Sequence, residues 1–169
     1  MSSPRYPAGT GSVAAIAGHP MHPMVVPLPI GALVLALAAD IAYFVTENPF
    51  WAEGAKWLLL AVLVTGALAA ILGIIDLVSL ARARRMIIAL AHGGGNAVML
   101  AITLANYLTR PEQAAGEPMI GGFILTVLAV ALSMVTGWLG GELSFRHGIG
   151  VSPGIGDGAG SEPARTPRS

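Results

Sequence analysis

Four long runs of apolar residues dominate the chain, and they cover about 24–45, 57–80, 86–108 and 119–143. Each run is long enough to cross about 30 Å of hydrocarbon as a helix that rises about 1.5 Å per residue. We therefore predict an all-α integral membrane protein in which residues 18–151 form a bundle of four transmembrane helices. The flanking segments, 1–17 and 152–169, are rich in Gly, Pro, Ser and Ala and are predicted to be disordered.

The composition supports the same interpretation and narrows the function. Only 11% of the 169 residues are charged, whereas a soluble domain usually has about 25%. The net charge is zero and aromatic residues are scarce, which argues against nucleic-acid binding. Because the chain has no cysteine, iron–sulfur clusters held by thiolates, c-type haem and Cys-based zinc sites are excluded.

The distribution of Lys and Arg predicts the orientation in the membrane. With four spans, both chain ends and the turn between the second and third spans lie on one side. That side carries seven cationic residues, which are Arg5, Arg82, Arg84, Arg85, Arg146, Arg165 and Arg168. The other side carries Lys56 and Arg110. Since cationic loops stay in the cytoplasm, we predict that both termini are cytoplasmic.

Prolines and small residues mark the expected helix geometry. Four prolines fall within ten residues at the start of the first span, and each removes a backbone donor, so the regular helix is expected to begin at Pro23 or only at Pro29. Small residues recur along one stripe of the fourth span, at Ser133, Gly137 and Gly141, and allow close helix packing. The second span has a similar stripe at Gly66, Ala70 and Gly73.

All four histidines are predicted to lie near the cytoplasmic face. His19 and His22 precede the first span, His92 lies about two turns into the third, and His147 follows the fourth. Glu142 falls in the same layer. The His19 and His22 rings have an alternative role, since they could bond backbone carbonyls that the prolines leave free, and His147 also suits a helix carboxyl terminus.

His92 is the strongest candidate, because an ionisable side chain inside a span is costly and usually faces the bundle interior. A polar stripe at helical spacing continues from it, through Asn96, Met99, Thr103 and Asn106. We expect Gly93–Gly95 to leave a flat surface on which a planar cofactor could lie. The alternative is a seam of hydrogen bonds to neighbouring helices.

Two carboxylates also fall within the spans. Asp40 lies deeper in the first span, where it would stay protonated or find a donor, and it could belong to a proton path or to a buried hydrogen bond. Asp76 lies near the three arginines of the tight turn, Arg82, Arg84 and Arg85. We expect a charge-assisted pair there that stabilises the turn.

Three features of the chain are distinctive as a set: the doubled His-Pro motif His-Pro-Met-His-Pro-Met at 19–24, His92, and the ending Arg-His-Gly at 146–148. With them the chain resembles a bacterial family of four-helix membrane proteins that is catalogued as a domain of unknown function, family 2231. The resemblance covers about residues 19–151 and implies a location in the bacterial cytoplasmic (inner) membrane. Some relatives are joined to Rieske-type iron–sulfur modules, which implies electron transfer and a partner of that kind.

The first functional hypothesis is a membrane redox protein that binds haem b. Its axial ligands would be His22 and His92, which lie at similar depth on different spans, and Asn96 would line the site. The haem propionates would bind at the arginine turn, Arg82, Arg84 and Arg85.

Two other hypotheses stay open. A protein that binds or transports a divalent metal, zinc or non-haem iron, would use imidazoles and one carboxylate as ligands, from His19, His22, His92, His147 and Glu142. A structural or assembly subunit would use the histidines only for hydrogen bonds. The chain has no catalytic triad, phosphate loop or dinucleotide fingerprint, so a conventional enzyme is the weakest hypothesis.

Overall fold

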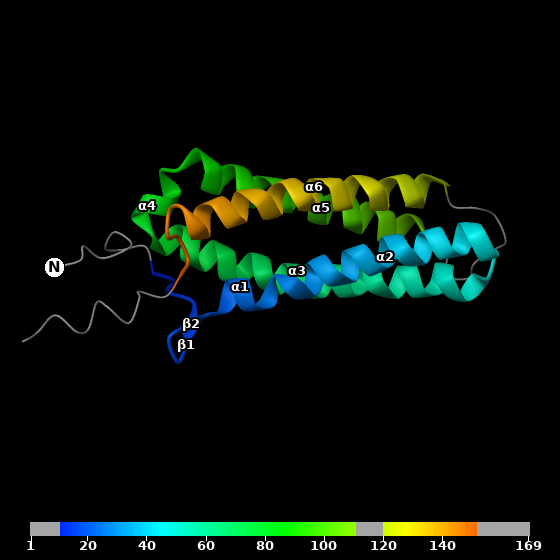
Figure 1. Ribbon diagram of the computed structural model, residues 1–169, viewed down its shortest axis with the longest axis horizontal. Coiled ribbons are helices and arrows are strands. Elements are labelled where there is room, and N and C mark those ends of the chain that lie inside the picture. The colour runs from blue at the N-terminus through cyan, green and yellow to red at the C-terminus, as the bar shows by residue number, and fades with distance from the viewer. Residues whose placement is uncertain (1–10, 111–119, 152–169) are drawn as a thin grey trace, which may run out of the picture.

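The computed structural model describes residues 11–110 and 120–151, and this part of the chain is mostly helical (Figure 1). Four helical segments in it are long and apolar enough to span a membrane, as predicted. The elements in chain order are β1 (Ala15–Ile16), β2 (His19–Pro20), α1 (Met21–Val25), α2 (Pro27–Thr46), α3 (Pro49–Ser79), α4 (Ala81–Arg84), α5 (Ile87–Thr109) and α6 (Ile120–Phe145).

The long helices form two antiparallel pairs, α2 with α3 and α5 with α6 (Figure 1). The pairs pack side by side, because α3 contacts α5 and α2 contacts α6. The described ends of the chain meet, since Gly11 pairs with Val151 and the Ser12 amide donates to the Val151 carbonyl at 3.2 Å. We call this end of the bundle, which also holds α4, His22 and His92, the histidine end, and the opposite end, near Arg110, the arginine end.

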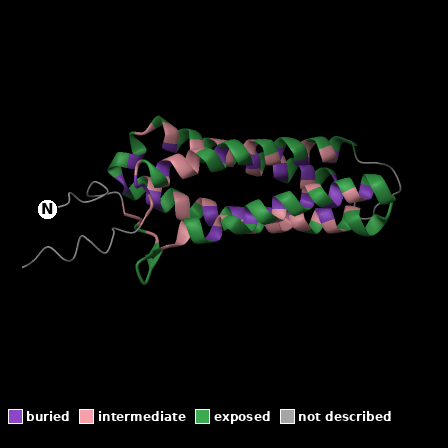
Figure 2. Cartoon of the chain, in the orientation of Figure 1, coloured by how far each residue is buried: buried purple, intermediate pink, exposed green. Residues whose placement is uncertain are grey.

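Buried residues form a small interior between the helices, and exposed residues cover the outside of the bundle (Figure 2). The interior cluster between the four helices consists of Leu33, Ala36, Leu59, Val62, Met99 and Ala129. Many large apolar side chains point outward instead, among them Ile87, Trp138 and Leu108. Apolar surface of this extent is favourable only against hydrocarbon, so the chain is built for a lipid bilayer.

The first two observed spans are clearly longer than the apolar runs that predicted them. The second was predicted over 57–80, but α3 begins at Pro49, where the Asn48 side chain caps the helix by accepting from the Phe50 amide at 3.0 Å. The first span is broken at Val26, so that α1 begins before Pro23 and α2 begins at Pro27. Proline at the first turn of α2 suits that break, because it has no amide proton to donate.

Part of the predicted amino-terminal tail is ordered. Residues 15–16 form β1, which pairs antiparallel with β2, and Ser12 to Ala14 bind the bundle. The folded domain therefore includes residues 11–17, and the expectation of disorder up to residue 17 was wrong for this segment. Residues 1–10 and 152–169, also predicted to be disordered, and the predicted start of the fourth span at Met119 lie outside the described residues.

Candidate functional site: a histidine pair between the helix pairs

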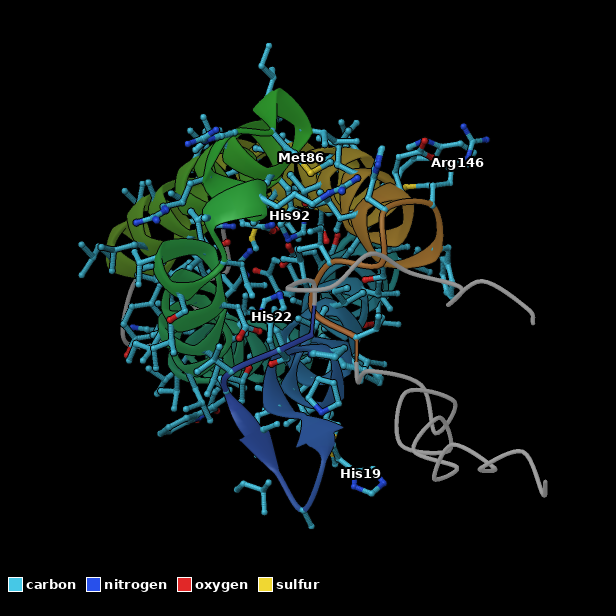
Figure 3. The ribbon with its side chains drawn as sticks, turned by 90° about the vertical axis from the view of Figure 1, so that its left-hand side faces the viewer. His19, His22, Met86, His92 and Arg146 are labelled. Carbon is cyan, nitrogen blue, oxygen red and sulfur yellow. The ribbon has the colours of Figure 1, made fainter. Side chains whose placement is uncertain are left out.

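The rings of His22 and His92 lie near each other at the histidine end (Figure 3). Their centroids lie 6.3 Å apart and the ring planes are nearly perpendicular, at 89°. His22 comes from α1 and His92 from α5, so each helix pair contributes one ring. The sequence predicts His22 and His92 at equal depth on different spans, and in the structure they are neighbours.

Each ring is held through its Nδ1 atom by the backbone of the helix beside it. Nδ1 of His22 donates to the Ala69 carbonyl of α3 at 2.8 Å, and Nδ1 of His92 donates to the Thr136 carbonyl of α6 at 2.8 Å. A carbonyl oxygen only accepts, so the proton of each neutral ring must be on Nδ1. The Nε2 lone pair is then left for a ligand, which is the arrangement found in metal-bound histidines.

Each ring also packs against a glycine on the same neighbouring helix. A Cβ atom at Gly73 of α3 would lie 3.0 Å from Cε1 of His22. A Cβ atom at Gly140 of α6 would lie 2.9 Å from Cε1 of His92. Both contacts are shorter than carbon atoms normally allow, so the rings fit only because these positions carry no side chain. The glycine at 73, predicted to serve helix packing, accommodates a histidine.

Asn96 lies beside the His92 ring and links α5 to α6. Its Nδ2 donates to the His92 carbonyl at 2.8 Å, and its Oδ1 accepts from Thr136 Oγ1 at 3.0 Å. Nδ2 is almost equally far from the two ring nitrogens, at 3.5 Å from Nδ1 and 3.3 Å from Nε2. It therefore lies to the side of the ring and not along the Nε2 lone pair.

The three glycines after His92 do not form the predicted flat surface at the site. A Cβ atom at Gly93 or Gly94 would meet nothing within 4 Å, and both residues are exposed on the outside of α5. Gly95 faces α6, where a Cβ atom would lie 2.6 Å from Thr136 Cγ2. That prediction was wrong, because the helical turn directs the first two glycines outward and the third serves helix packing.

The other predicted metal ligands do not join the pair. His19 is exposed on the β1–β2 hairpin, away from His22 in Figure 3, and its Nδ1 bonds the Ala17 carbonyl at 3.0 Å. Glu142 pairs instead with Arg146 at 3.0 Å. Within residues 11–110 and 120–151, no group of three or more His, Asp or Glu residues could hold a metal ion, so the predicted five-residue ligand set is not one site.

The carboxylate of Asp76 binds the amino-terminal segment and not the arginine turn. It accepts from Ser12 Oγ at 2.8 and 2.9 Å, and from the amides of Val13 and Ala14 at 2.8 and 3.0 Å. The predicted pair with the turn is therefore wrong, since the amino-terminal segment supplies nearer donors. The turn arginines are exposed at the histidine end, at Arg82, Arg84 and Arg85.

Asp40 has a full set of partners at the arginine end. Arg110 donates to both of its carboxylate oxygens at 2.7 Å, and Thr126 Oγ1 donates to one of them at 2.7 Å. Arg110 Nε donates in turn to Asn106 Oδ1 at 3.1 Å. These residues are all buried. Of the roles left open for Asp40, the structure gives it a buried ion pair that joins α2 to α5 and α6.

Comparison with known proteins identifies the family. The model of the family described as "Predicted membrane protein (DUF2231)" matches residues 18–153. The chain belongs to this family. No curated protein and no solved structure matches the chain. The family description agrees with the four membrane-spanning helices, and the match includes both histidines of the pair.

Proposed function

We propose that this DUF2231 protein binds haem b between its two helix pairs, with His22 and His92 as axial ligands, and serves in electron transfer within the membrane. The observation that carries the proposal is the separation of the two ring centroids. A nitrogen about 1.2 Å from its ring centre binds a first-row metal at about 2.0–2.1 Å, so rings on opposite sides of one ion have centroids about 6.5 Å apart. The centroids here are 6.3 Å apart.

The donor set favours haem over an isolated metal ion. Zinc sites use three or four protein ligands and non-haem iron uses two histidines with a carboxylate, but the described residues contain no such group. Haem brings its own four nitrogen ligands and needs only two imidazoles. A pair of histidines from different helices is therefore sufficient for haem b.

The surrounding residues would orient the ligands. The bonds from Nδ1 to the Ala69 and Thr136 carbonyls fix each ring and make its Nε2 a stronger base. The exposed arginines of the turn, Arg82, Arg84 and Arg85, would bind the haem propionates at the membrane surface. Haem supplies reversible one-electron transfer when bound. A Rieske-type partner stays a prediction from the family resemblance.

An absorption spectrum tests the proposal. The protein, expressed in haem-replete cells and purified in mild detergent, should show a Soret band whose α and β bands sharpen on reduction with dithionite. His22→Ala and His92→Ala should each abolish the bands. His19→Ala is the matched control, because His19 belongs to the same His-Pro motif but is exposed and distant from the pair.

The alternatives give different outcomes in the same samples. A colourless preparation would overturn the haem proposal. Equimolar zinc or non-haem iron in that preparation, lost in His92→Ala, would favour the divalent-metal hypothesis. If elemental analysis finds neither metal above background, the histidines only hold helices together, which is the structural hypothesis.

We also infer that the histidine end faces the cytoplasm. Its arginine turn is exposed, whereas Arg110 at the opposite end is neutralised by Asp40 and no longer counts as a loop charge. The chain has no native cysteine, so single cysteines report the side directly. Arg84→Cys should react with an impermeant maleimide only after the membrane is opened, and Glu53→Cys should react in intact cells. The reverse pattern would overturn the orientation.

A further inference from the structure

The two helix pairs share one pattern of buried positions. Each buried residue of α6 comes 67 positions after a buried residue of α3. The α3 residues are Ala55, Leu59, Val62, Gly66, Ala69 and Asp76, and the α6 residues are Gly122, Thr126, Ala129, Ser133, Thr136 and Leu143. Residue types differ at all six of these matched positions, so the burial pattern repeats but the amino-acid sequence at these positions does not.

The first helices of the two pairs correspond in the same way. Four buried residues of α2 precede four buried residues of the second pair by 70 positions. They are Pro29, Leu33, Ala36 and Asp40, matched by Met99, Thr103, Asn106 and Arg110. The same offset relates His22 to His92, and it makes the two partners of the buried ion pair equivalent positions.

Helical periodicity alone aligns buried stripes on any two amphipathic helices, so the burial pattern needs independent support. The histidine contacts supply it. The carbonyls that accept from the two rings, at Ala69 and Thr136, are 67 positions apart. The glycines beneath the rings, Gly73 and Gly140, are also 67 positions apart. The offset of 67 positions that matches the buried residues therefore also matches the hydrogen bond and the glycine contact of one histidine with those of the other.

The arrangement in space agrees with an internal two-fold. In Figure 1 α2 and α5 run in one direction, while α3 and α6 run in the other. The contact of α2 with α6 then corresponds to the contact of α5 with α3. Such an axis runs along the bundle, and the histidine pair lies across it at one end as the ion pair does at the other.

We propose that the chain is a duplicated helix pair in which each copy supplies one half of the ligand site: a histidine, the carbonyl that orients it and the glycine on which it rests. Gly73 and Gly140 are accordingly positioning residues of equal importance. This inference rests on the proposed function for the identity of the ligand, but its geometry can be tested without any ligand.

Alanine substitutions with matched controls test the two glycines. Gly140→Ala should displace the His92 ring, and Gly73→Ala should displace the His22 ring, because each added Cβ would lie within 3.0 Å of a ring carbon. Gly137→Ala is the control for α6 and Gly54→Ala for α3, since a Cβ at either position meets nothing within 4 Å. The controls also gain helix propensity and should fold normally.

The ligand-free readout is the ¹⁵N spectrum of the histidine rings in detergent. In Gly140→Ala the ring signals of His92 should lose the pattern of a proton fixed on Nδ1, while those of His22 keep it, and Gly73→Ala should show the reverse. In haem-loaded protein, both variants should bind haem at least tenfold more weakly than the controls, and by similar factors.

Further variants separate a ring clash from general misfolding. Gly140→Ala combined with His92→Ala should melt no lower than His92→Ala alone, because the ring is absent and alanine favours the helix; additional loss would show that Gly140 serves something else. The inference is overturned if Gly140→Ala has the spectrum of Gly137→Ala, or if only one glycine matters. If no haem binds but both ring displacements occur, the duplicated site stands and the proposed function fails.

Discussion

The two ends of the bundle each hold a polar pair across the same axis, but only one pair is complete in itself. At the arginine end, both carboxylate oxygens of Asp40 are bonded and Arg110 is buried among its acceptors. At the histidine end, Nδ1 of each ring donates to a backbone carbonyl, and the lone pair of Nε2 points to no such partner and can bind a ligand. The first pair serves as a permanent connection, and the second can accept a ligand.

The role of a polar group at membrane depth depends on whether all of its hydrogen-bonding atoms already have partners, and not on its presence alone. The polar centres lie about 27 Å apart along α5, near opposite membrane surfaces. From the sequence alone, ionisable residues at both polar centres, such as His92 and Asp40, were candidates for a functional site. A pair whose polar atoms are all bonded to protein holds helices together. A pair that keeps a lone pair unused, in an interior where the other polar groups are bonded, is a candidate ligand site.

The largest expected effect comes from breaking the buried ion pair between Asp40 and Arg110. Arg110→Met leaves the Asp40 carboxylate buried without a counter-ion and should lower the free energy of unfolding by about 3–5 kcal/mol. Thermal unfolding in detergent measures it. Asp40→Leu with Arg110→Met removes both charges and should recover much of the loss. A single variant as stable as the unmodified protein would show that the pair contributes nothing.

Asp76→Ala should have the next largest effect, because it removes the acceptor for three donors of the amino-terminal segment. Hydrogen bonds to a charged group contribute about 1.5–3 kcal/mol each, but water replaces part of them here, so we expect a loss of about 2–3 kcal/mol. The change should be local. Amide exchange at Val13 and Ala14 should accelerate, while exchange in α5 and α6 should not; unchanged exchange at Val13 would contradict the anchor.

His22→Ala should separate stability from function. The bond to the Ala69 carbonyl is a neutral hydrogen bond, so its loss should cost only about 1–2 kcal/mol including packing. Haem binding should nevertheless be lost completely. The melting temperature is compared in haem-free protein, because bound haem would itself stabilise the folded state, and haem content is measured in haem-loaded protein. A large drop in melting temperature with haem retained would reverse our assignment of the two ends.

Glu142→Ala should have the smallest effect. Its partner Arg146 is largely exposed, with 74% of the side chain accessible, and exposed ion pairs contribute less than about 1 kcal/mol. The proposed metal-ligand role of Glu142 predicts a different result. Unchanged melting and unchanged spectrum are expected, and loss of bound metal in this variant would restore the divalent-metal hypothesis.

Features that depend on one element were predictable from the sequence. The four spans follow from apolar runs, and the choice of His22 and His92 followed from equal depth. Contacts between elements were not predictable in the same way. Arg110 was counted as a loop charge, and Asp76 was assigned to the nearest arginines along the chain. In both cases the partner is more than 60 residues away and only the folded bundle brings it close.

One signal for the buried pair was available in the sequence. In alternating spans, Asp40 and Arg110 both fall near the same face of the membrane, and an acid and a base at one depth tend to pair. The role of Gly73 and Gly140 had no such signal, because Gly73 belongs to a small-residue stripe that suits helix packing and Gly140 is only a neighbour of another such stripe in the sequence. Only the position of a ring above each glycine distinguishes a site from helix packing.

The bridge between Gly11 and Val151 has a consequence for partners that are attached covalently. It brings both described ends of the chain together at the end of the bundle where the histidines lie. A domain joined by a short flexible linker to either end would be present near the site at an effective concentration in the millimolar range. If the proposed haem is bound there, such a fused domain would exchange electrons with it efficiently even with a weak intrinsic affinity for the bundle.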